Sequence, residues 1–145
     1  MKKRLMAASA ALLMIFFCAC GANQDVPKEA LEIVKEELLQ IEEAGSSFSI
    51  KYIGKTINAY VVLPGTSEEM SSAMMGNENA VKKWSKLISE TNDFCFEIKD
   101  RLRSSGYDDI DVVMSIMDEN NTDLLMVQSK NGTLYYDVVS GIDLR

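Results

Sequence analysis

A long apolar stripe in the middle of the chain constrains the fold more than any other feature. Its members recur at alternating steps of three and four residues over three heptads: Val81, Trp84, Ile88, Thr91, Cys95, Ile98 and Leu102. Leu87 and Phe94 broaden the stripe. Its period predicts an α-helix from about residue 80 to residue 105, which Gly106 ends. A coiled-coil seam between two copies would bury the stripe, and so would a sheet of the same chain. The strands predicted on both sides of the helix favour the sheet.

Alternation of apolar and polar residues predicts these strands. Two runs, at 48–52 and 57–63, flank Gly54-Lys55, which suits a two-residue hairpin turn of type II′. A third run, 110–117, follows the long helix. The last two strands flank Asn131-Gly132, which predicts a type I′ hairpin.

The turn at Asn131-Gly132 also predicts the register of the last hairpin, because a two-residue turn places Lys130 opposite Thr133. Further from the turn, the predicted pairs are Val127 with Tyr136, Leu125 with Val138, Gln128 with Tyr135 and Met126 with Asp137. The first two of these pairs form the predicted buried side of the hairpin.

The remaining elements are helical. A first helix is predicted from about Pro27 to Ala44, since proline suits a first helical position. A short helix through Met75 is predicted to begin at a capping box made by Thr66 and Glu69. The order is α-β-β-(short α)-α-β-β-β. It predicts an α+β fold with a five-stranded, mainly antiparallel sheet, helices packed on one face, and no parallel βαβ repeat.

The N-terminus has the pattern of a secretory signal peptide. Three basic residues, at positions 2–4, precede an uncharged apolar run from Leu5 to Phe17, and Cys18-Ala19-Cys20-Gly21 follows. This segment resembles the lipobox of bacterial lipoproteins, which signal peptidase II cuts before a cysteine that carries lipid. Phe17 stands where the family usually has leucine. The resemblance covers residues 1–21 and carries no information about the rest of the chain.

The resemblance implies three parts: a signal peptide at 1–19, a lipidated Cys20 with a short tether at 20–26, and a single α+β domain at 27–145. It places the domain at the extracytoplasmic face of the cell membrane, held by acyl chains such as palmitate. An uncleaved membrane helix and plain secretion are the alternatives. The run from Leu5 to Cys20 has 16 residues, which is fewer than the roughly 20 that a membrane span requires.

Charge limits the partners of such a domain. The chain has 15 Lys and Arg against 22 Asp and Glu. Without the three basic residues of the leader, 12 remain against 22, a formal charge of −10. A domain this acidic repels nucleic-acid phosphates, so no nucleic-acid partner is expected.

Few residues suggest chemistry. Histidine is absent, which removes the usual base of serine and cysteine triads and the commonest zinc ligand. Cys95 lies in the apolar stripe, which predicts a buried, unreactive thiol. We therefore expect no catalytic residue, no cofactor and no metal site.

Three clusters of candidate ligands have structural explanations that we prefer. Asp118, Asn120 and Thr122 alternate as at the start of an EF-hand loop, but Asp123 stands where that loop needs glycine, so a polar turn is the better interpretation. The second cluster could bind Cu(I) and consists of Met70, Met74 and Met75. The third could form a carboxylate centre and consists of Asp108, Asp109 and Asp111. Helix packing explains the methionines, and a solvated turn explains the aspartates.

The sequence therefore predicts a membrane-anchored lipoprotein with a non-enzymatic domain that contacts another envelope protein. An accessory lipoprotein that binds a small ligand is the first alternative, and a hydrolase that uses carboxylates is the second. The fold class cannot decide among them, because the same architecture serves many functions.

Overall fold

The computed structural model describes residues 26–42 and 45–145. The predictions for the signal peptide 1–19, the lipid attachment at Cys20 and the tether up to residue 25 lie outside these residues. Val26, predicted as the last tether residue, is fully buried in the core and belongs to the folded domain.

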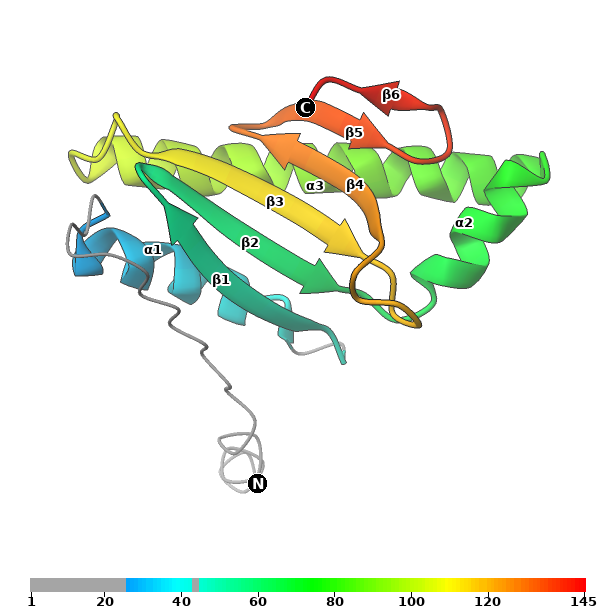
Figure 1. The fold of residues 1–145 in the computed structure, drawn as a ribbon, viewed down its shortest axis with the longest axis horizontal. Coiled ribbons are helices and arrows are strands. Elements are labelled where there is room, and N and C mark those ends of the chain that lie inside the picture. The colour runs from blue at the N-terminus through cyan, green and yellow to red at the C-terminus, as the bar shows by residue number, and fades with distance from the viewer. Residues whose placement is uncertain (1–25, 43–44) are drawn as a thin grey trace, which may run out of the picture.

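The described residues form three helices and six strands in an α+β fold (Figure 1). The elements, in chain order, are α1 (Lys28–Leu39), β1 (Ser47–Ile53), β2 (Thr56–Val62), α2 (Thr66–Met74), α3 (Glu78–Ser104), β3 (Asp111–Met117), β4 (Leu125–Lys130), β5 (Thr133–Asp137) and β6 (Ile142–Asp143). Strands β1 to β6 lie in the sheet in the order in which they occur in the chain. The predicted fold class is confirmed.

The sheet is mainly antiparallel, as predicted, and differs from the prediction in two details. The sheet is mixed, because β2 and β3 are parallel whereas every other neighbouring pair is antiparallel. The connection through α2 and α3 carries the chain back along the sheet, so that β3 starts at the same end as β2. The sheet also has a sixth strand, β6, which pairs with β5. Its two residues are too few to show the alternation that identifies a strand.

Both hairpin turns form as predicted, with Ile53 opposite Thr56 and Lys130 opposite Thr133. Asn131 and Gly132 both have positive φ angles, of 51° and 88°, as a type I′ turn requires.

Beyond the second turn, the predicted register of the last hairpin is wrong. The register shifts between Gln128 and Ser129, so that Gln128 pairs with Tyr136 and Val127 pairs with Asp137. Tyr135 is the extra residue of this β-bulge. The bulge turns the buried Asp137 toward the helix side of the sheet, where its Oδ1 accepts a hydrogen bond from Trp84 Nε1 at 2.8 Å.

The helix ends depend on local hydrogen bonds. Helix α3 begins at Glu78, two residues before the predicted start, because Asn77 Oδ1 accepts bonds from the amides of residues 79 and 80. The predicted capping box of α2 does not form, because Thr66 Oγ1 donates to the carbonyl of Leu63. Instead, both carboxylate oxygens of Glu119 accept from the amide of Gly65, at 2.9 and 3.0 Å.

Helix α1 is shorter than predicted. It ends at Leu39, and the amides of Gln40 and Ile41 bond to carbonyls three residues earlier, both at 3.1 Å. The chain therefore tightens into a 3₁₀ turn after Leu39. The predicted end, Ala44, lies outside the described residues.

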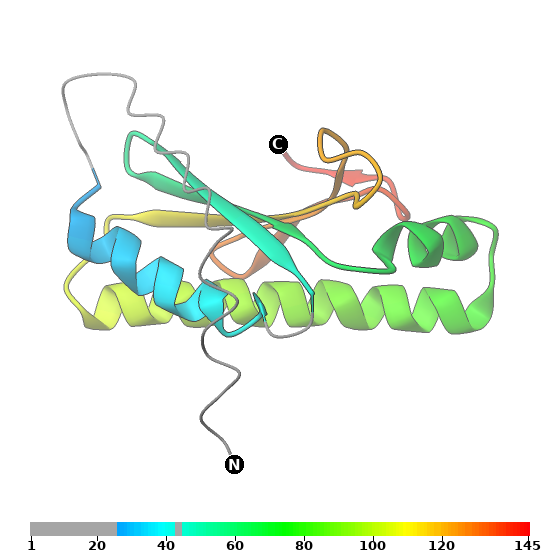
Figure 2. The ribbon, with the colours of Figure 1, turned by 90° about the horizontal axis from the view of Figure 1, so that it is seen from below.

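The core lies between the sheet and the two longer helices, α1 and α3, which both pack on one face (Figure 2). The stripe of α3 packs inside the domain: Trp84, Thr91, Cys95, Ile98 and Leu102 are buried, whereas Val81 is 41% exposed. The facing residues of β2 and β3 are also buried, at Ile57, Ala59, Val61, Val112, Met114 and Ile116. The predicted packing of the stripe on a sheet of the same chain is confirmed.

Candidate functional site

A groove opens on the helix side of the sheet because its two covering helices differ in length. At a rise of 1.5 Å per residue, the 12 residues of α1 span about 18 Å and the 27 residues of α3 about 40 Å. Helix α1 therefore lies beside only one half of α3, as Figures 1 and 2 show. Where α1 ends, a groove of about 380 Å³ remains between α3 and the sheet. We call it the α3 groove.

The inside of the α3 groove is apolar. Its floor is formed by side chains of β2, β3 and the residue after β2, and these are Val61, Leu63, Met114 and Ile116. Leu87, Thr91 and Phe94 of α3 form one wall, and Ile41 closes the end near α1. Leu87 and Phe94 are half-buried, so apolar surface remains in contact with solvent. An apolar concave surface of this kind is typical of a binding site.

The outer rim of the α3 groove is acidic. Glu90, Asp93 and Glu97 line it from α3, and no Lys or Arg of the described chain is part of the lining. Glu90 forms an ion pair with Lys86 at 3.4 Å, on the exposed side of the helix. Within residues 26–42 and 45–145, Asp93 and Glu97 form no ion pair.

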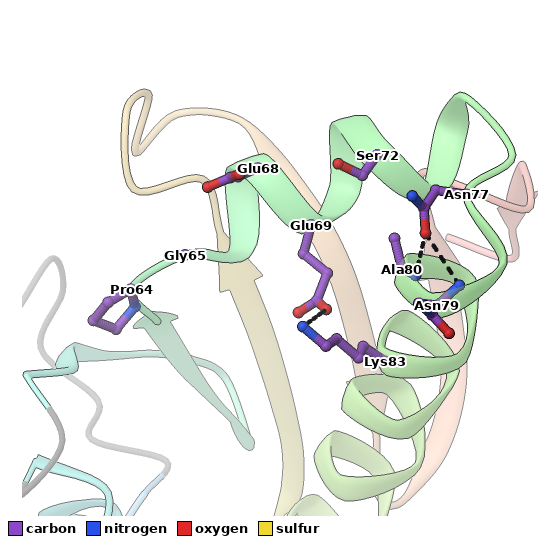
Figure 3. A pocket seen from close by; sticks show the side chains of 9 residues that line it. All are labelled: Pro64, Gly65, Glu68, Glu69, Ser72, Asn77, Asn79, Ala80 and Lys83. Carbon is purple, nitrogen blue, oxygen red and sulfur yellow. Dashed lines mark hydrogen bonds and ion pairs between the residues drawn. The ribbon is translucent and has the colours of Figure 1, made fainter.

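A second hollow, of about 440 Å³, lies between α2 and the start of α3 (Figure 3). Its lining is polar: Pro64, Gly65, Glu68, Glu69, Ser72, Asn77, Asn79, Ala80 and Lys83. Figure 3 shows Glu69 and Lys83 pointing toward each other, and their charged atoms are 3.6 Å apart. Asn77 caps α3. These groups hold the two helices together, and we assign this polar hollow a structural role.

The loop after β3 also has a structural role. Asp118 is buried, and its Oδ1 accepts hydrogen bonds from Ser67 Oγ at 2.6 Å and from the amide of Asn120 at 2.7 Å. The bond from Ser67, followed by the amide of Asn120, lowers the pKa of the Asp118 carboxyl. The polar turn is therefore the interpretation that the hydrogen bonds support, and the loop anchors the first turn of α2.

The three aspartates around the start of β3, Asp108, Asp109 and Asp111, each have a different partner. Asp109 contacts Lys55, whose hydrogen bond lowers the pKa of the Asp109 carboxyl. Asp108 accepts from Arg103 Nε at 2.9 Å. Asp111 accepts from Asn131 Nδ2 at 2.8 Å and lies 3.0 Å from Lys130 Nζ, and its pKa is lowered chiefly by the bond from Asn131.

The three methionines, Met70, Met74 and Met75, also differ in burial. Met70 packs against the core, whereas Met74 and Met75 are 59% and 81% exposed. Cys95 is fully buried, and burial raises the pKa of its thiol. Across the described ranges, no group of three or more Cys, Asp or Glu side chains is close enough to hold a metal ion.

Sequence reasoning found the walls of the α3 groove but not the groove. Leu87 and Phe94 broaden the apolar stripe, and Glu90, Asp93 and Glu97 follow them along the same side of α3. This juxtaposition of apolar and acidic residues is visible in the sequence. The end of α1 at Leu39, which leaves that side of α3 uncovered, is not.

None of the helices in the described part of the chain combines the length and the apolar composition that a membrane span needs. Comparison of the chain with protein-family models, curated proteins and solved structures finds no match.

Proposed function

We propose that this chain is a lipoprotein, anchored through Cys20 at the extracytoplasmic face of the membrane, whose non-enzymatic domain binds a segment of another envelope protein. The observation that carries the binding part is the α3 groove, an apolar channel that the domain leaves open beside its longest helix. The lipobox resemblance at residues 1–21 supports the anchor.

The groove suits a side chain of a protein partner. Leu87 and Phe94 are partly exposed at its wall. In protein interfaces a few side chains buried in well-packed pockets supply most of the binding energy. The floor belongs to two central strands, β2 and β3, and is therefore held rigidly by the sheet. A preformed apolar surface loses little conformational entropy when a partner binds.

A photocrosslinking pair tests the binding part. Phe94 and Phe96 are on the same helix, but Phe94 lines the groove and Phe96 is 52% exposed on another side of α3. Each is replaced by p-benzoyl-phenylalanine in the full-length chain, and intact cells are irradiated. We expect a covalent adduct with one envelope protein from position 94 and little of it from position 96. Equal adducts from both positions, or none from position 94, would contradict the proposal.

A mass measurement tests the anchor. The native protein should begin at Cys20 and carry acyl mass, because two acyl chains are what stable anchoring requires. Cys20→Ala should then release the protein from the membrane fraction. Firm membrane association of the Cys20→Ala variant would contradict lipid anchoring.

Binding of a small apolar ligand is the second candidate function, and the groove volume favours it. At about 380 Å³ the groove falls within the range of about 300–1,000 Å³ that small-molecule sites occupy. Such a ligand, added to the purified protein, should raise its melting temperature as its concentration rises. A protein adduct from position 94 without any such ligand would favour the first function.

A further inference from the structure

This inference rests on the proposed function and specifies the partner of the same groove. We propose that the segment held in the α3 groove is cationic and amphipathic, with an apolar side chain inside the groove and Lys or Arg residues that contact Asp93 and Glu97.

Two neighbouring negative charges on the rim of the α3 groove favour a cationic partner. Asp93 and Glu97 lie one helical turn apart, so their side chains project from the same side of α3. Like charges at this spacing destabilise a helix. By contrast, Glu36 and Glu37 of α1 are both paired with Arg101 of α3. Within residues 26–42 and 45–145, neither Asp93 nor Glu97 forms an ion pair that would offset their repulsion.

The same charges make other occupants unfavourable. A second copy of this chain has a formal charge of −7 over its full length and would bring the same acidic groove, so that the two rims would repel each other. Anionic lipid headgroups would be repelled for the same reason. A purely apolar ligand would fill the groove but leave Asp93 and Glu97 without partners. A segment with apolar and basic residues satisfies both features together.

Two double variants of equal charge test the proposal. Asp93→Asn with Glu97→Gln neutralises the rim, whereas Glu68→Gln with Asp123→Asn removes two negative charges outside the groove. Both are made in the full-length chain carrying p-benzoyl-phenylalanine at position 94, and the adduct is quantified in isolated envelope membranes. Exposed ion pairs are individually weak, so the rim variant should lower the adduct yield about three- to tenfold. The control should stay within about twofold of the parent protein.

Salt provides a second measurement on the parent protein and the rim variant. Raising NaCl from about 50 to about 500 mM shortens the screening length. It should therefore lower the adduct yield of the parent protein, with little effect on the rim variant. Circular dichroism of both variants should match the parent, because the substituted side chains contact solvent.

The outcomes separate this inference from the proposed function. If position 94 gives its adduct but neither salt nor the rim variant changes the yield, the groove binds a partner and the cationic assignment is wrong. The same holds if the control variant lowers the yield as much as the rim variant. If the preference for position 94 over position 96 is itself absent, the proposed function is wrong as well.

Discussion

Trp84 and Asp137 join the longest helix to the end of β5 through a buried hydrogen bond. The indole Nε1 donates to Asp137 Oδ1 at 2.8 Å, and the two residues are 2% and 3% exposed. The same carboxylate accepts from the amides of Val139 and Ser140, at 3.0 and 3.2 Å, and so orders the turn before β6. One side chain thus fixes both the helix and the last turn of the chain.

Removal of the Asp137 carboxylate should destabilise the fold. Asp137→Ala leaves the indole N–H of Trp84 buried without an acceptor, and such a loss costs about 1–3 kcal/mol. Urea denaturation should show a fall of this size in the free energy of unfolding. A double-mutant cycle with Trp84→Phe should give a coupling energy of about 0.5–3 kcal/mol. Additive effects of the two substitutions would mean that the hydrogen bond between Trp84 and Asp137 contributes nothing to the free energy of unfolding.

Gly132 should tolerate no side chain. Its φ angle is +88°, and an added Cβ would lie 2.6 Å from Phe96 Cβ and 3.2 Å from Phe96 Cα. Gly106 is the matched control, because its φ angle is +91° and no atom lies within 4 Å of its Cβ position. Gly106→Ala should cost about 1–2 kcal/mol for the left-handed backbone alone. Gly132→Ala should cost about 1–3 kcal/mol more because of overpacking. Equal losses in urea denaturation would show that Phe96 moves freely away.

Asp118 should make the free energy of unfolding depend on pH. Hydrogen bonds lower its folded-state pKa below the ordinary value near 3.8. Its contribution is therefore fully present above that ordinary value and is lost as the pH falls through the folded-state pKa. As the pH falls from about 5 to about 2, the free energy of unfolding should therefore decrease less in Asp118→Asn than in the parent protein.

Asp123→Asn is the control for this pH series, because Asp123 lies in the same loop and its carboxylate is exposed. Urea denaturation at several pH values compares the three proteins. A parent protein and an Asp118→Asn variant with parallel pH profiles would contradict the assigned role of Asp118.

Cys95 should be unreactive in the folded protein. Its side chain is fully buried and burial raises the pKa of its thiol, so both access and the thiolate fraction are low. A polar reagent such as Ellman's reagent should label it only after guanidinium is added. Labelling of the native protein at the rate of a free thiol would contradict this placement.

Local patterns were sufficient to predict most elements of the fold. The alternation in β2 and β3 and the stripe of α3 depend on neighbouring residues, and the structure buries both where expected. The direction of β3 relative to β2 could not be predicted, because it depends on how α2 and α3 return the chain over a long distance. The bulge at Tyr135 was missed for a similar reason: it accompanies the contact of Asp137 with Trp84, which lies 53 residues away.

The candidate site was less predictable than the fold. Phe94 and Leu87 were expected on a broad apolar face, and the sequence gives no sign that part of this face is uncovered. That depends on the 3₁₀ turn after Leu39, whose two hydrogen bonds end α1 early. The lipid anchor at Cys20 depends on the leader motif and stays a prediction.

The most direct measurement of the central claim is the ratio of protein adducts formed from positions 94 and 96 in intact cells with an unaltered Cys20. These positions are two residues apart on α3, so expression and anchoring are shared, and position 94 lines the groove whereas position 96 does not. The account predicts a ratio of at least about fivefold in favour of position 94, with the adduct on a single envelope protein. A ratio near one, or an adduct spread over many proteins, would contradict it.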